Sequence, residues 1–173
     1  MRISSSAERA RFVTLHGLLL ALALICSYLE AQIPLPIPIP GVKLGVANIV
    51  VAFCAYILSL RSALIISLLR VSIVAFLFGS VSSFFFSLCG AMFSFLALAL
   101  LLLVFPRRVS PIGLSALCAV MHNIGQLTAA SILFNTNAVI VYLPHMIAAA
   151  AATGTFTGIL LCTLLRKFPQ NIL

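Results

Sequence analysis

Six long apolar segments, separated by short polar or proline-containing breaks, account for most of the chain. A helix that crosses the hydrocarbon core of a bilayer needs about 20 apolar residues, and each segment approaches or exceeds that length. The pattern predicts transmembrane helices at about residues 12–33, 44–60, 62–78, 83–105, 112–134 and 138–165. Little chain is left over, so we expect one integral membrane domain over residues 1–173 and no separate aqueous domain.

The first break is a run of alternating prolines, Pro34, Pro36, Pro38 and Pro40, followed by Gly41. Proline removes a backbone donor and cannot continue a helix, so this segment is predicted to be extended, with a turn at Gly41. It is also apolar, which favours packing against the protein or into the membrane interface. No small-residue cleavage site follows residues 12–33, so that segment is interpreted as a retained helix and not as a signal peptide.

Composition excludes a soluble protein, because 64% of the residues are hydrophobic and only 7% are charged. The net charge of +8 would suggest nucleic acid in a soluble chain, but basic residues normally collect at the cytoplasmic ends of membrane helices. With the N-terminus inside, only Lys43 falls outside and Arg70 falls within a span, whereas the inner side holds Arg2, Arg9, Arg11, Arg61, Arg107, Arg108, Arg166 and Lys167. This asymmetry predicts an all-α, polytopic protein of the cytoplasmic (inner) membrane, with both ends inside and no nucleic-acid partner.

Several kinds of catalytic site are missing. The sequence has no aspartate and so no Ser-His-Asp triad, no Walker A loop, and no paired acids to hold Mg²⁺ on a diphosphate. The five cysteines lie apart inside apolar runs, which does not support a metal site or a disulfide framework. We therefore expect neither an enzyme nor a bound cofactor.

Polar side chains inside the spans are costly, and each is a functional hypothesis. They lie toward the middle and outer half of the predicted bundle, which predicts a pocket that opens outward and is closed on the inner side. We expect the solute to be bound by Asn48, Arg70, His122, Asn123 and Gln126. The proline loop is expected to gate this pocket through Glu30, Pro40, Gly41 and Lys43.

Each of these residues has a structural alternative. His122, Asn123 and Gln126 share a broad helix face and could instead form interhelical hydrogen bonds. Arg70 could bind an anionic solute, pair with Glu30 or bond helix-end carbonyls, and Glu30 could pair with Lys43. The small-residue pairs Gly17/Ala21 and Gly154/Gly158 favour close helix packing, for which contacts within the chain are the expected use.

Several runs together carry a resemblance to a known family. They are Leu29-Glu30, the segment PGVKLGVAN at 40–48, Arg70, Phe78-Gly79, the segment SLCG at 87–90 and the segment HNIGQ at 122–126. The chain resembles the Gx transporter family, also known as heptaprenyl diphosphate synthase component I. The resemblance implies a six-helix membrane protein similar to the substrate-binding S-components of energy-coupling-factor importers, which rely on separate ATPase and coupling subunits. It leaves open a second function, as a non-catalytic membrane component associated with a prenyl synthase in heptaprenyl diphosphate or quinone biosynthesis.

Overall fold

The computed structural model describes residues 6–32, 45–105, 109–136 and 138–168, and every element within them is helical. A short 3-10 helix, η1 (Ala138–Tyr142), precedes the last of six α-helices, which are α1 (Ser6–Gln32), α2 (Val46–Ile57), α3 (Leu60–Phe78), α4 (Val81–Val104), α5 (Pro111–Phe134) and α6 (Leu143–Lys167). Five of them are long and apolar enough to cross a membrane. The prediction of an all-α polytopic bundle is confirmed.

The second helix is shorter than predicted. It has 12 residues, and a rise of about 1.5 Å per residue gives it a length of about 18 Å, well short of a bilayer's hydrocarbon core. Gly45 begins the helix in the left-handed conformation, with φ of 80°. The helix ends before Ser59, whose hydroxyl accepts a hydrogen bond from the Ser62 N–H and caps α3. The predicted span over residues 44–60 had merged α2 with this break.

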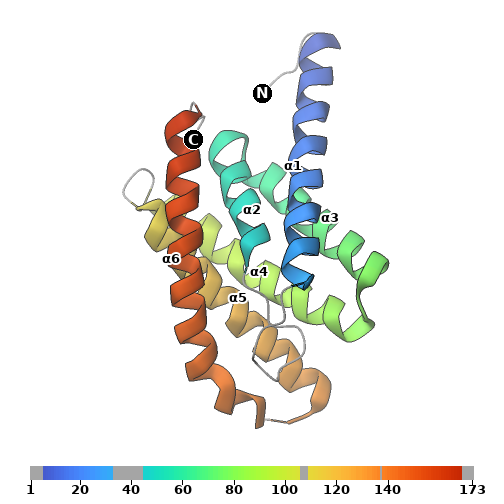
Figure 1. The fold of residues 1–173 in the computed structure, drawn as a ribbon, viewed down its shortest axis with the longest axis vertical. Helices are drawn as coiled ribbons and strands as arrows, with labels where there is room; N and C mark the ends of the chain where they lie inside the picture. Colours follow the sequence, from blue (N-terminus) through green and yellow to red (C-terminus); the bar gives the residue numbers. More distant parts are fainter. Residues whose placement is uncertain (1–5, 33–44, 106–108, 137, 169–173) are drawn as a thin grey trace.

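Neighbouring helices run in opposite directions, and Figure 1 shows the start of α1 and the end of α6 at the same end of the bundle. We call this the terminal end and the opposite one the far end. Described basic residues gather at the terminal end, namely Arg9 and Arg11 in α1, Arg61 in α3, and Arg166 and Lys167 in α6. The predicted placement of both chain ends on one side of the membrane agrees with this arrangement.

The bundle divides into two halves of three helices. In one half, α5 packs closely on both α4 and α6, and in the other α1, α2 and α3 pack on one another. Large apolar side chains cover the outside of both halves, including Phe76 at 91% exposure and Ile132 at 76%. In a bilayer these side chains face lipid, which explains why so apolar a chain has such a small buried core.

That core surrounds α2 near the terminal end. Nine residues of α2 are buried, and most of them belong to an apolar core that also includes side chains from the five other helices, such as Ala23, Ile66, Leu102, Leu114 and Leu161. Near the far end, the described residues provide only a small cluster of Phe86, Ala129 and Ala130. The bundle is therefore tightly packed toward the terminal end and more weakly packed beyond its middle.

Glycines bring α4, α5 and α6 into backbone contact. A Cβ added to Gly125 would lie 2.6 Å from the carbonyl oxygen of Cys89, and one added to Gly154 would lie 2.6 Å from the Cα of Ala116. The same holds for Gly158 on α6 against α5. Packing within the chain, expected for the Gly154/Gly158 pair, is confirmed. Gly17 differs, because no atom outside its own neighbourhood lies within 4 Å of its added Cβ.

Candidate functional site

The arginine near the middle of α3 is the most unusual residue of the bundle. Arg70 is 7% exposed, and its guanidinium donates to the Ser27 hydroxyl at 3.4 Å and to the Asn48 side-chain oxygen at 3.3 Å. Both distances exceed the usual 2.7–3.2 Å or so of an N–H···O bond. The Nε–H of Arg70 has no hydrogen-bond partner within the described part of the chain. A buried guanidinium with long bonds to neutral groups and a free N–H is incompletely satisfied.

Glu30, at the end of α1, accepts a hydrogen bond from the backbone N–H of Gly45. Gly45 is the N-cap of α2, so the carboxylate also lies at the positive end of that helix dipole. Burial of Glu30 to 6% exposure is compatible with such charge-assisted bonding. The bond fixes the start of α2 against the end of α1. The predicted pairing of Glu30 with Lys43 falls outside the described residues, as do Pro40 and Gly41 of the predicted gate.

Charged and polar side chains from both halves meet in one cavity, which we call the arginine cavity. Its polar lining consists of Ser27, Glu30, Asn48, Arg70, Ser87 and His122, with Gly45, Val71 and Val74 beside them. The first half contributes Glu30, Asn48 and Arg70, and the second contributes Ser87 and His122. About 10 Å³ is open to the centre of a water molecule, which is room for about one water.

Three of the five predicted solute-binding residues, Asn48, Arg70 and His122, therefore line a common cavity. The other two serve helix contacts. The Asn123 amide donates to the Met146 carbonyl oxygen of α6 at 2.9 Å. Gln126 lies against Gly90 of α4, where its Cγ is 2.9 Å from an added Cβ. Asn123 thus makes the kind of interhelical hydrogen bond that was the alternative to solute binding, and Gln126 lies at the contact between α4 and α5.

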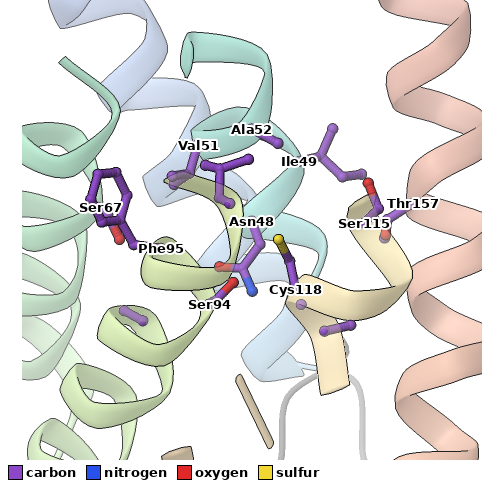
Figure 2. A pocket seen from close by; sticks show the side chains of 14 residues that line it. Asn48, Ile49, Val51, Ala52, Ser67, Ser94, Phe95, Ser115, Cys118 and Thr157 are labelled. Atoms are coloured by element: carbon purple, nitrogen blue, oxygen red, sulfur yellow. The ribbon is translucent and has the colours of Figure 1, made fainter. Parts of the chain in front are cut away.

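A second cavity, drawn in Figure 2, shares Asn48 with the first and contains hydroxyl groups that no sequence motif had singled out. We call it the hydroxyl cavity. About 20 Å³ is open to the centre of a water molecule, and its polar lining consists of Asn48, Ser67, Ser94, Ser115, Cys118 and Thr157. The spacing of these residues in the sequence could have revealed two of the hydroxyl groups. Ser94 lies seven residues after Ser87, and Ser115 lies seven residues before His122, which places each pair on one helix face.

The chemistry available in the two cavities is that of recognition. Arg70 offers N–H donors to a carboxylate or phosphate, and the amide and hydroxyl groups offer neutral hydrogen bonds. Among the described residues, no three histidine, cysteine or acidic side chains come together as a metal site would require. The arrangement resembles small-molecule pockets, in which a few polar groups orient a ligand in otherwise apolar surroundings.

A comparison with protein-family models identifies the family of this chain. The model of the heptaprenyl diphosphate synthase component I family matches residues 19–164, which include α2 to α5, the second half of α1, most of α6 and both cavities. Neither the curated proteins nor the solved structures contain a match to this chain.

Proposed function

We propose that this chain, which belongs to the heptaprenyl diphosphate synthase component I family, is the solute-binding membrane subunit of a transporter. The observation that carries the proposal is Arg70. Its guanidinium is buried in the middle of the bundle, makes two long hydrogen bonds to neutral groups, and has an Nε–H without a described partner. An ionised group inside a membrane protein is expensive and is retained chiefly where it has a function.

The chemistry of Arg70 indicates the kind of solute. Guanidinium binds planar carboxylates and phosphates through two parallel N–H···O bonds, which are stronger than its bonds to hydroxyl or amide oxygens. Glu30 lies close enough to Arg70 for an electrostatic interaction, and its carboxylate is bonded to the Gly45 N–H. Because an acidic group on the solute offers Arg70 stronger bonds, it would replace the weak contacts of Arg70 with Ser27 and Asn48.

Solute binding requires the bundle to open, because the arginine cavity holds only about one water molecule. Its lining is divided between the two halves, so separation of α1, α2 and α3 from α4, α5 and α6 would enlarge it. The apolar core around α2 lies toward the terminal end and would keep that end closed. This geometry supports access from the far end, which the charge distribution assigns to the outside of the cell.

Transport against a gradient would depend on partners, because the chain has no nucleotide-binding motif. We propose an ATPase with a membrane coupling subunit as the partner and the cytoplasmic membrane as the location. No catalytic role is proposed for this chain.

The test is to purify the protein in lipid nanodiscs and to identify the small molecules that remain bound, by extraction and mass spectrometry. Wild type is compared with Arg70→Gln, and with Arg61→Gln as the matched control, since Arg61 is an exposed arginine of the same helix. We expect an acidic small molecule that wild type and Arg61→Gln retain and Arg70→Gln loses by more than about tenfold, the equivalent of one charged hydrogen bond. Equal retention by all three proteins would refute the role of Arg70.

The family description favours a second function, as a non-catalytic membrane component that supports a prenyl synthase. Purification of the native complex separates the two functions. A prenyl synthase that co-purifies in stoichiometric amount, without an ATPase, would favour the second function and contradict the first.

A further inference from the structure

Hydroxyl groups from several helices meet in the hydroxyl cavity. Ser67, Ser94 and Ser115 come from α3, α4 and α5, are each at least nine-tenths buried, and converge with Asn48 of α2 on one small space. A buried hydroxyl is costly without a hydrogen-bond partner, and hydroxyls around a cavity meet that need through whatever occupies it. Figure 2 shows the side chains of Asn48, Ser94 and Cys118 around the same space.

The two cavities are stacked along the bundle axis. On every helix that contributes to both, the residue in the hydroxyl cavity lies nearer the terminal end. Ser67 precedes Arg70 on α3, Ser94 follows Ser87 on α4, and Ser115 precedes His122 on α5, in agreement with the alternating helix directions. Shifts of three to seven residues correspond to about 5–10 Å along a helix. The hydroxyl cavity is therefore deeper than the arginine cavity, as seen from the far end.

Asn48 lies at the boundary and lines both cavities. Its side-chain oxygen accepts the 3.3 Å hydrogen bond from Arg70, which holds the amide in place. An acidic group that engages Arg70 competes with this acceptor and releases the Asn48 side chain. Binding of an acid in the arginine cavity would then connect that cavity with the hydroxyl cavity.

We propose that the two cavities are parts of one binding site, with Asn48 as a partition that moves when an acid binds Arg70. The ligand class is a small molecule with one carboxylate or phosphate and an uncharged body that carries several hydrogen-bonding groups. The acid binds at Arg70 and the body occupies the hydroxyl cavity. The inference rests on the proposed function but makes a separate prediction about connectivity, which needs no identified ligand.

Cys118 provides a natural reporter, because its side chain lines the hydroxyl cavity. The probe is 2-sulfonatoethyl methanethiosulfonate, a small membrane-impermeant anion, and peptide mass spectrometry measures modification of Cys118 separately from the other four cysteines. The probe is added to membrane vesicles of each orientation, which contain wild type, Asn48→Ala or Asn123→Ala. Asn123→Ala is the control, since that amide bonds α6 and lines neither cavity.

We expect Cys118 to react from the far-end side only, and to react about fivefold faster in Asn48→Ala than in wild type, as the loss of one hydrogen bond predicts. Asn123→Ala should react at the wild-type rate. A rate unchanged by Asn48→Ala, labelling from the terminal-end side, or no labelling of Cys118 in any folded variant would each overturn the partition. Loss of retained solute in Arg70→Gln combined with an unchanged Cys118 rate would disprove the partition and leave the transporter proposal standing.

Discussion

The two halves of the bundle are packed by different means. In the half made of α4, α5 and α6, glycines bring helix backbones together, and a Cβ added to Gly125, Gly154 or Gly158 would lie 2.5–2.6 Å from a backbone atom. In the half made of α1, α2 and α3, the described glycine of α1, Gly17, has open space around it. This half instead holds Glu30 and Arg70, the buried charges of the described chain.

The difference indicates which half can move. Helices in backbone contact gain close packing over their whole interface and shift only as a unit. The half made of α1, α2 and α3 shares the apolar core around α2, but toward the far end it meets the other half across the arginine cavity, where long hydrogen bonds are weaker and can be exchanged for contacts with a ligand. We therefore interpret α4, α5 and α6 as the rigid platform of the site, and α1, α2 and α3 as the half that rearranges. Four substitutions test this interpretation, in order of decreasing effect.

The largest effect is expected from Gly125→Ala in the platform. The new methyl group would meet the Cys89 carbonyl and the Gly90 Cα, so α4 and α5 must separate. Overpacking of this kind typically costs up to about 3 kcal/mol. Thermal unfolding in one detergent measures the loss of stability. Gly17→Ala is the control and should be neutral or gain up to about 1 kcal/mol from helix propensity; equal effects at both positions would erase the contrast between the halves.

Arg70→Met is expected to destabilise the mobile half by about 3 kcal/mol, because it removes the positive charge that offsets the buried Glu30 carboxylate. The same variant should lose the solute that wild type retains. Differential scanning fluorimetry and analysis of the bound small molecules measure the two outcomes. Retention of the solute by Arg70→Met, despite the loss of stability, would mean that Arg70 is chiefly structural.

Glu30→Gln should weaken the link between α1 and α2. The neutral amide keeps an acceptor for the Gly45 N–H but loses the charge assistance, at a cost of about 1.5 kcal/mol. Hydrogen exchange should accelerate at the first residues of α2 and remain unchanged in α5. Acceleration spread evenly over both halves would contradict their independence.

The smallest effect is expected from Asn123→Ala, which removes one hydrogen bond between α5 and α6. Single interhelical bonds in membranes contribute about 0.6 kcal/mol on average. Stability should fall by that amount with no loss of solute. A large loss of bound solute in this variant would show that Asn123 takes part in solute binding, and that the platform contributes to the binding site through it.

The sequence predicted the helices well, because hydropathy reports directly on the transfer of side chains into lipid. It overestimated α2 because Leu58 and Leu60 continue the apolar pattern across a break that only the Ser59 cap reveals. The sequence could predict that Asn48, Arg70 and His122 lie together, because burying each of them alone in the membrane would be costly. The separate role of Asn123 could not, because adjacent residues lie about 100° apart around a helix, and only the position of α6 determines which one faces the cavity.

The brevity of α2 has a consequence for how the protein enters the membrane. Nine of its twelve residues are buried, so the other five helices make most of the contact with lipid. A segment of about 18 Å inserts poorly by itself, but a two-residue connection ties it to α3, which is long enough to span. Insertion as a helical hairpin would let the longer partner carry the shorter one into the bilayer.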